Sequence, residues 1–299
     1  MEQQKSAFVA IVGRPNAGKS SLMNSLLGQK VVIVSDKPQT TRTRIMGVLT
    51  ENEYQYVFID TPGIHRPQNR LGDYMVTAAK SGMQQGDVVM LVVDVNKPVS
   101  KTELEVIEYL KREGVPSILV LNKIDTVRRE MIAEKIAAYA SKHEFDAVIP
   151  VVAKSGKHVD EVMDELSKFL HESEWFFPED AATDQPMRQY VSEIIREKLL
   201  RALDREVPHG IAVVIEEYRD TGNLTKIRAE IICEKQSHKQ IIIGKGGEVL
   251  KKVGMYSREE LEKLTGSKIF LDLWVRVKEN WREREGLVSN FGYNKKDID

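Results

Sequence analysis

Cysteine is almost absent from this 299-residue chain, and long apolar runs are missing. The single cysteine, Cys233, excludes an internal disulfide framework and a cysteine-rich metal site, and its apolar neighbours favour a buried, unreactive thiol. No segment reaches the roughly 18 consecutive apolar residues of a membrane span. The first residues, MEQQKSAFVA, lack the basic start and long apolar core of a secretion signal. These absences predict a cytoplasmic protein.

An excess of charge of either sign is also missing. Lys and Arg number 44 against 45 Asp and Glu, which leaves a net charge of −1, so binding to nucleic acid would need a local basic surface. The six histidines show no metal-ligand spacing such as HExxH, and we assign none of them to a metal. The length is enough for two domains of ordinary size.

The first part of the chain alternates short apolar runs with amphipathic segments. Continuous apolar strands joined by helices are typical of a mainly parallel sheet covered on both faces. The predicted strands are FVAIV, IMGVLT, YQYVFID, VVMLVVD, PSILVLN and AVIPVV. Helices are predicted at KTELEVIEYLKREG and REMIAEKIAAYASK. We therefore predict a doubly wound α/β domain over residues 1–175.

A linker is predicted next, because HESEWFFPEDAATDQP contains two prolines and no periodicity, and we place it at residues 176–185. Its aromatic residues suit a contact surface or, as we favour, a clasp that closes the first domain. Residues 186–280 then show a long amphipathic helix, two strands, a glycine loop set in a helix-turn, a further helix and a last strand. This pattern predicts a smaller α+β domain of order α-β-β-α-α-β, followed by a tail at 281–299.

The motif GRPNAGKS, residues 13–20, lies between the first predicted strand and a helix and fits G-x-x-x-x-G-K-[ST]. Such a loop lets backbone N–H groups curl around phosphate oxygens at a helix N-terminus. We expect Lys19 to reach the β- and γ-phosphates and the Ser20 hydroxyl to ligate Mg²⁺. Taken alone, the motif could still be a chance match in an ordinary strand-turn-helix.

Three further motifs follow predicted strands. In DTPG, Asp60 can hold the metal through water while the Gly63 N–H senses the γ-phosphate. In NKID, the Asp125 carboxylate can accept two hydrogen bonds from guanine N1–H and the exocyclic amine, which adenine does not present together. In AKSG, a backbone N–H can bond the guanine carbonyl oxygen. Together these motifs predict guanine nucleotide binding.

Their order and spacing resemble those of the translation-factor-type P-loop GTPases over about residues 5 to 170. The resemblance implies nucleotide contacts from Gly13, Arg14, Pro15, Asn16, Ala17, Gly18, Lys19, Ser20, Ser21, Asp60, Thr61, Pro62, Gly63, Asn122, Lys123, Asp125, Ala153 and Lys154. It also makes SDKPQTTRTR, residues 35–44, resemble the first switch. Ser20, Thr41 and Asp60 are then the implied Mg²⁺ ligands, with Thr40 as the alternative to Thr41.

One departure from Ras-like enzymes concerns catalysis. Ile64 stands where those enzymes have the glutamine that orients water, and isoleucine can neither donate nor accept a hydrogen bond. Asn16 is similar to an asparagine that ligates K⁺ in several GTPases with such a hydrophobic residue, although it could simply bond within the loop. Asn16 and Thr41 are therefore catalytic candidates. Arginines at 14, 42, 44 and 66 could each supply a cis arginine finger, and we assign none of them.

The second glycine loop, GKGG at 244–247, lacks the spacer and the Lys-Ser ending of a nucleotide-binding loop. Five lysines and one glutamate lie between residues 235 and 252, and Ile241 to Ile243 form an apolar ledge beside the loop. Backbone N–H groups, lysines and an apolar groove suit single-stranded RNA, while an ordinary turn is the alternative. The predicted RNA-binding residues are Lys239, Ile242, Ile243, Gly244, Lys245, Gly246, Gly247, Lys251 and Lys252.

With this loop, residues 186–280 resemble a type II KH domain, and the pairing of the two domains resembles the Era GTPase family. That resemblance implies hydrolysis of GTP with Mg²⁺, binding of the single-stranded 3′ end of small-subunit ribosomal RNA, and a role in assembling the small ribosomal subunit. The tail could add stacking contacts to RNA or be partly disordered.

Two other functions are compatible with the same residues. The chain could be an RNA-binding module that uses GTP as a structural ligand, or a signalling GTPase at the cytoplasmic face of a membrane. No lipidation motif or extended basic amphipathic helix supports the membrane alternative. No motif indicates an obligate protein partner.

Overall fold

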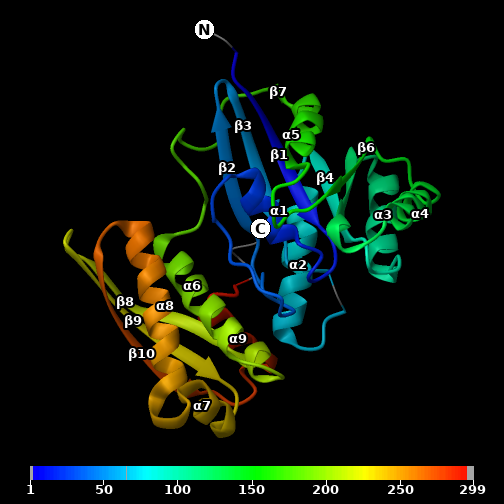
Figure 1. The fold of residues 1–299 in the computed structure, drawn as a ribbon. Helices are drawn as coiled ribbons and strands as arrows, with labels where there is room; N and C mark the ends of the chain where they lie inside the picture. The colour runs from blue at the N-terminus through cyan, green and yellow to red at the C-terminus, as the bar shows by residue number, and fades with distance from the viewer. Residues whose placement is uncertain (1–2, 65, 295–299) are drawn as a thin grey trace.

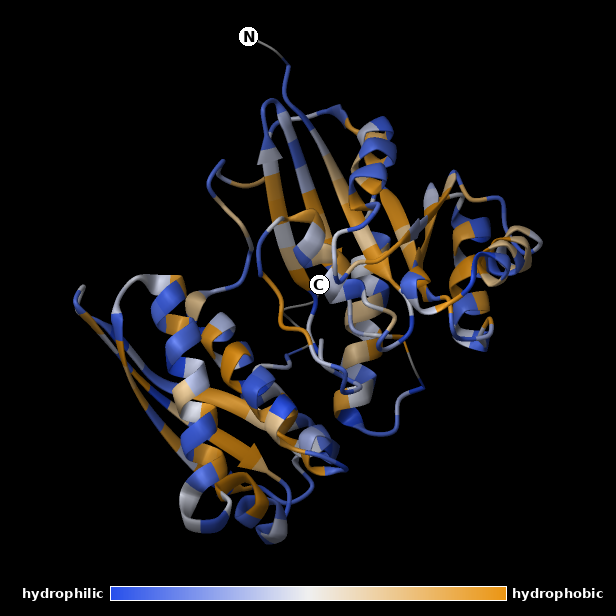
Figure 2. Cartoon of the chain, in the orientation of Figure 1, coloured by the Kyte–Doolittle hydropathy of each residue, from blue (hydrophilic) through white to orange (hydrophobic). Residues whose placement is uncertain are grey.

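The computed structural model of the chain describes residues 3–64 and 66–294. It contains two domains of different size, each with its own sheet and helices, joined by an ordered linker (Figure 1). Figure 2 shows apolar residues along the central strands of the larger sheet and on one side of the helices that cover it. No helix in the described part of the chain is long and apolar enough to cross a membrane.

The first domain is built on a seven-stranded sheet of order β2-β3-β1-β4-β5-β6, with β7 paired to β1. Strands β1, β3, β4, β5 and β6 run parallel, whereas β2 and β7 are antiparallel to their neighbours. The strands are β1 (Lys5–Val12), β2 (Ile45–Glu51), β3 (Tyr54–Asp60), β4 (Val88–Asp94), β5 (Ser117–Asn122), β6 (Ala147–Val151) and β7 (His171–Glu172). The six predicted strands are thus confirmed.

Helices cover both faces of this sheet, as the continuous apolar strands predicted. They are α1 (Lys19–Leu26), α2 (Arg70–Gln84), α3 (Lys101–Glu113), α4 (Arg129–Ala140) and α5 (Val159–Leu166), with short η1 (Ile124–Thr126) and η2 (Ser167–Phe169). The local sequence explains the ends of α3, where Ser100 and Glu103 form a capping box and Gly114 closes the helix at φ 64°. Two separate apolar cores lie on the two faces.

The register of the parallel strands places the predicted motifs at one edge of the sheet. Ile11 is paired with Asp60, Asp94 with Asn122, and Asn122 with Val151. The loops that follow β1, β3, β5 and β6 therefore meet beyond the carboxyl ends of the strands, where ligands bind in open α/β sheets.

The linker packs along the first domain. Phe176 and Phe8 pack edge to face with ring centroids 4.7 Å apart, and Gln55 Oε1 accepts hydrogen bonds from the N–H groups of Phe176 and Phe177. Thr183 forms a bridge to Gly47 on the edge strand β2. These contacts agree with the predicted clasp, and they cover part of a sheet edge that would otherwise be open.

The second domain has the predicted order α-β-β-α-α-β. Its sheet has the order β10-β9-β8, in which β9 pairs antiparallel with β8 and parallel with β10. The elements are α6 (Met187–Ala202), η3 (Val207–Gly210), β8 (Ala212–Asp220), β9 (Leu224–Cys233), α7 (Gln236–Ile243), η4 (Lys245–Gly247), α8 (Glu248–Thr265) and β10 (Lys268–Val277). Cys233 is buried in this domain, as predicted.

Of the two alternatives for the tail, disorder does not apply to residues 281–294. They form η5 (Trp281–Glu283) and α9 (Glu285–Asn290), which pack against α2 of the first domain. Trp281, Val288 and Tyr293 are buried there with Leu71 and Tyr74. The remaining predicted tail residues, 295–299, lie outside the described residues. The segment 281–294, here called the C-terminal segment, therefore joins the two domains through an apolar cluster.

Candidate functional site

The phosphate loop requires its glycines for steric reasons. Gly13 has φ 148°, and a Cβ there would lie 2.2 Å from the carbonyl oxygen of Val92. Gly18 has φ 98°, and its Cβ would lie 2.0 Å from Nδ2 of Asn122. Any side chain at either position would force the loop away from the strands that support it. The loop is thus shaped as the motif predicted.

Two opposite charges are buried beneath the loop. Lys19 donates hydrogen bonds from Nζ to the carbonyl oxygens of Gly13 (3.3 Å) and Arg14 (3.1 Å). Burial lowers the pKa of Lys19 to about 8, although the charge of Asp60 acts in the opposite direction. Burial likewise raises the pKa of Asp60, against the charge of Lys19. A bound phosphate would favour the charged lysine, and a bound cation would favour the charged carboxylate.

The three predicted metal ligands converge at this point. Ser20 Oγ donates to Asp60 Oδ2 (2.7 Å) and lies 2.9 Å from Thr41 Oγ1. Thr41 Oγ1 also donates to Asp60 Oδ2 (3.2 Å). The other carboxylate oxygen, Oδ1, is buried and accepts no hydrogen bond from residues 3–64 and 66–294. Such a set of oxygen donors fits Mg²⁺.

The geometry separates the two candidate threonines of the first switch. Thr41 is buried with its hydroxyl toward Ser20 and Asp60. Thr40 instead donates to the carbonyl oxygen of Lys37 (2.7 Å), within the switch itself. The arrangement therefore favours Thr41 as the metal ligand.

Asn122 connects the loops that would surround a base. Its Nδ2 donates to the carbonyl oxygen of Ala17 (2.8 Å), and its Oδ1 accepts from the N–H groups of Lys123 (2.8 Å) and Ala153 (3.0 Å). Lys123, at φ 66°, extends Nζ to the carbonyl oxygen of Asn16 (2.8 Å). Asn122 thus brings the phosphate loop, NKID and AKSG together, and leaves Asp125 exposed nearby.

Two adjoining hollows occupy this edge of the sheet. One, of about 50 Å³, lies between the phosphate loop, the first switch and Gly63. The other, of about 520 Å³, lies between α1 and AKSG and includes Lys154. Ser21 and Val34 line both hollows. The predicted residues Thr61 and Pro62 are buried beside them, and the Thr61 hydroxyl donates to the Ile11 carbonyl (2.8 Å), so that side chain supports the strand instead.

The other residues considered for catalysis, and Ile64 in the place of the glutamine, make contacts within the protein. Ile64 is partly buried against the core, and its N–H donates to the Gly13 carbonyl oxygen (3.1 Å). Asn16, at φ 62°, donates from Nδ2 to the carbonyl oxygen of Asp36 in the first switch (2.7 Å). Among the four arginine candidates, Arg42 is buried toward the second domain, which removes it from the phosphate site.

The second predicted site also has conformationally special glycines. Gly244, Gly246 and Gly247 all have positive φ, and a Cβ on Gly244 would lie 2.6 Å from Cγ2 of Val249. Lys245 is exposed between these glycines, and Lys251 and Lys252 are exposed near the start of α8. Lys239 is half-buried on α7. The loop therefore presents an exposed backbone among cationic side chains.

The structure does not form the predicted apolar ledge from all three isoleucines. The run Ile241–Ile243 ends helix α7, so its three side chains point in different directions. Ile242 is fully buried in the core of the second domain, and Ile243 is half-buried. Ile241 is exposed and is the apolar residue that faces solvent beside the loop. The helical period of α7 would have identified it.

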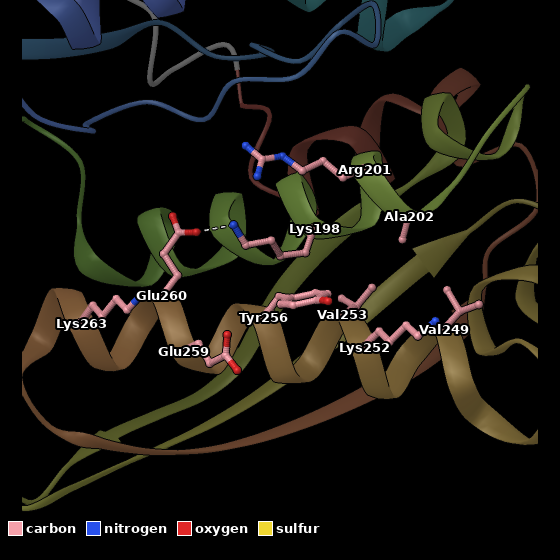
Figure 3. A pocket seen from close by; sticks show the side chains of 10 residues that line it. All are labelled: Lys198, Arg201, Ala202, Val249, Lys252, Val253, Tyr256, Glu259, Glu260 and Lys263. Atoms are coloured by element: carbon pink, nitrogen blue, oxygen red, sulfur yellow. Dashed lines mark hydrogen bonds and ion pairs between the residues drawn. The ribbon is translucent and has the colours of Figure 1, made fainter.

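A third cavity, of about 590 Å³, lies between α6 and α8 (Figure 3). One stripe of α8, from Val249 to Lys263, and the α6 residues Lys198, Arg201 and Ala202 line it. Of the predicted site residues, only Lys252 lines it. An ion pair between Lys198 and Glu260 crosses the cavity wall.

Comparisons with known proteins agree with this arrangement. Residues 8–123 match a family described as 50S ribosome-binding GTPase, and residues 206–282 match the KH domain. The GTPase Era of Alkaliphilus metalliredigens (strain QYMF) is 46% identical over 97% of this chain and 99% of its own. The GTPase Era of Clostridium botulinum (strain Okra / Type B1) is 47% identical with the same coverage.

Two solved structures are similar over almost their whole length. One is Era in complex with MgGDPNP and nucleotides 1506–1542 of 16S ribosomal RNA, with TM-score 0.93 and 40% identity. The other is an Aquifex aeolicus Era variant bound to GDP.AlF4⁻, also with TM-score 0.93 and 40% identity. Each covers 97% of this chain and 99% of its own.

Proposed function

This chain belongs to the Era family of GTPases, and on that premise we propose that it binds and hydrolyses GTP as a molecular switch. Its second domain binds the single-stranded 3′ end of small-subunit ribosomal RNA, and the protein assists assembly of the small ribosomal subunit in the cytoplasm. The observation that carries the proposal is the convergence of Ser20, Thr41 and Asp60 beside Lys19, in a chain that also presents GKGG.

The residues of the first site divide the work of binding. The backbone N–H groups of the loop and the N-terminus of α1 hold phosphate oxygens, and Lys19 spans the β- and γ-phosphates. Mg²⁺ held by Ser20 and Thr41, with Asp60 acting through water, would neutralise charge on those phosphates. Asp125 selects guanine. Ile64 has no polar side-chain atom, so it cannot orient the attacking water.

The experiment measures multiple-turnover GTP hydrolysis with and without an RNA of the 16S 3′ end. The native protein should turn over GTP and bind the RNA, whereas Lys19→Ala should lose triphosphate binding or turnover and keep RNA binding. Lys101→Ala, an exposed lysine at the start of α3, is the matched control. GTP binding without turnover under both conditions would instead support an RNA-binding module that uses GTP as a structural ligand.

We further propose that Asn16 ligates a K⁺ ion that compensates for Ile64. The side-chain nitrogen of Asn16 is engaged by Asp36, so Oδ1 is the atom that would bind the cation. A monovalent cation beside the β- and γ-phosphates would stabilise the charge that develops during transfer. Single-turnover hydrolysis should be faster in K⁺ than in Na⁺ at equal ionic strength, and Asn16→Ala should lose that preference. Equal rates of the native protein in both salts would exclude the role.

A further inference from the structure

The second domain holds the first switch at several points. Glu197 Oε1 on α6 accepts a hydrogen bond from the backbone N–H of Val34 (3.1 Å), directly before the switch. Lys37 within the switch forms an ion pair with Asp204 (2.6 Å) beyond the end of α6. Figure 1 shows α6 on the side of the second domain that faces the first. The switch is thus attached to an element of the other domain.

The strongest attachments flank Thr41. On one side, Nη2 of Arg196 on α6 donates a short hydrogen bond to the carbonyl oxygen of Thr40. Arg196 is buried and is held in turn by an ion pair with Glu193 (2.5 Å). The carbonyl that it binds belongs to the peptide unit joining Thr40 to Thr41.

On the other side, Arg42 points into the second domain. It is 2% exposed, and it donates to the carbonyl oxygens of Ile211 (2.5 Å) and His209 (3.0 Å) and to the Tyr293 hydroxyl (3.2 Å). These three acceptors are uncharged, and burial lowers the pKa of Arg42. Burying a charged arginine against neutral acceptors costs free energy of folding. We therefore look for a functional role for this contact.

Thr41 lies between these two anchors, and its hydroxyl points away from them toward Ser20 and Asp60. The backbone that carries the proposed metal ligand is therefore fixed on both sides by the second domain. In GTPases the first switch is ordered by contacts with the γ-phosphate and Mg²⁺ and is released after hydrolysis. Anchoring the backbone in advance would reduce the entropy lost when that ordering occurs.

We propose that Arg196 and Arg42 are positioning residues for Thr41, so that the metal site for GTP is complete only when the second domain is docked. This inference rests on the proposed function and deepens it. Because the threonine serves the triphosphate state, the arginines favour binding of GTP with Mg²⁺ over binding of GDP.

The test compares binding of a fluorescent, non-hydrolysable GTP analogue with binding of fluorescent GDP to the full chain, at a series of Mg²⁺ concentrations. Arg196→Gln should release the analogue about tenfold faster and should need more Mg²⁺ for half-maximal binding, while the affinity for GDP changes by less than about twofold. Arg196→Lys, which keeps one donor for the Thr40 carbonyl, should recover part of the loss.

Arg188→Gln is the matched control. Arg188 lies on the first turn of the same helix and binds the carbonyl oxygens of Ile215 (3.3 Å) and Glu216 (3.0 Å) within its own domain. This variant should bind both nucleotides as the native protein does. Tyr293→Phe, which removes one acceptor from Arg42 and keeps the ring, provides a second measurement should Arg196→Gln fold poorly, and it should weaken the analogue selectively.

If the variants bound the analogue and GDP equally weakly, general damage would explain the loss and the inference would be overturned. It would also be overturned if Arg196→Gln, or Tyr293→Phe where that variant folds poorly, bound the analogue as the native protein does. If the native protein bound no guanine nucleotide, the proposed function itself would be refuted.

Discussion

Asn122 shows how much of the nucleotide site depends on one side chain. Its amide satisfies the carbonyl oxygen of Ala17 and the N–H of Ala153, which belong to loops far apart in the sequence. Its Nδ2 also occupies the space that a Cβ of Gly18 would need. A side chain at position 18 would therefore displace Asn122. The loop that carries Asp125 is held in place by the hydrogen bonds of Asn122.

Asp125→Asn should exchange a preference for GTP for a preference for XTP. The variant loses two charge-assisted hydrogen bonds to guanine, at a cost of about 3–6 kcal/mol, and its amide N–H faces the carbonyl that xanthine carries in place of the amine. Because Asp125 is exposed, the fold should be unaffected. Competition between GTP and XTP for the native and variant proteins measures the exchange; an unchanged margin for GTP would show that another residue reads the base.

Single residues also mark where prediction from the sequence stopped. The motifs identified Lys19, Ser20 and Asp60, because the chemistry of phosphate and metal demands those side chains at fixed spacing. The sequence favoured Thr41 and kept Thr40 as the alternative, since both have a hydroxyl and the loop has no period. The contacts that distinguish them lie in the structure: the Thr41 hydroxyl contacts Ser20 and Asp60, whereas the Thr40 hydroxyl donates to Lys37.

The turn between α7 and α8 interrupts the helical backbone at three glycines. Helix α7 ends at Gly244 because φ 77° continues poorly into a helix, and α8 begins after Gly247 at φ 82°. The predicted order of elements was confirmed, while the direction of the isoleucines was not. A run of three β-branched residues has the local preference of a strand. The helix instead buries Ile242 in the core of the second domain, and this packing outweighs the local preference.

Gly246→Asp should abolish most RNA binding and leave GTP binding unchanged. Position 246 has φ 61° and open space around a Cβ, so aspartate fits there at a cost of about 1 kcal/mol. The carboxylate would then stand where a phosphate is expected, and affinity for the 3′-end RNA should fall at least ~10-fold, with a shallower dependence on salt.

Gly222→Asp provides the control for that measurement. Gly222 also has a positive φ (83°) and open space, but it lies in the turn between β8 and β9, at the opposite end of β9 from α7. RNA affinity should stay near the native value in this variant. Full affinity in Gly246→Asp would return the loop to the status of an ordinary turn.

The C-terminal segment packs against both domains. Trp281 is fully buried, donates from Nε1 to the Gly210 carbonyl oxygen (2.9 Å) and stacks on Tyr293. Tyr293 in turn packs edge to face on Tyr74 of α2, with ring centroids 5.8 Å apart. One residue of this segment therefore contacts both the helix that follows DTPG and, through Arg42, the first switch.

Trp281→Ala should lower the free energy of unfolding by about 3–5 kcal/mol and split one unfolding transition into two. The reason is that the cavity opens in the cluster shared by the domains. Urea unfolding followed by circular dichroism and by nucleotide fluorescence would detect the split. Trp274→Ala, on the exposed face of β10, should cost less than about 1 kcal/mol; the same behaviour in both variants would contradict the role given to the cluster.

The arrangement of the two domains relative to each other could not be predicted from the sequence. Each domain has its own period and motifs, and both were predicted. The anchors between them join residues 163, 167 and 169 positions apart and use lysine, glutamate and arginine, which occur on every protein surface. Nothing in a local pattern separates a buried arginine such as Arg42 from a solvated one.

The bond between Arg42 and Tyr293 has a consequence for how the protein is made. The partners are 251 residues apart, and domains form in order as a chain leaves the ribosome. The first domain therefore emerges with Arg42 in water and its first switch unattached to the rest. The anchors to residues 196–211 can form earlier, but the bond from Arg42 to Tyr293 forms only after translation has passed residue 293, so a chain still under synthesis carries the nucleotide-binding motifs with an incomplete set of anchors.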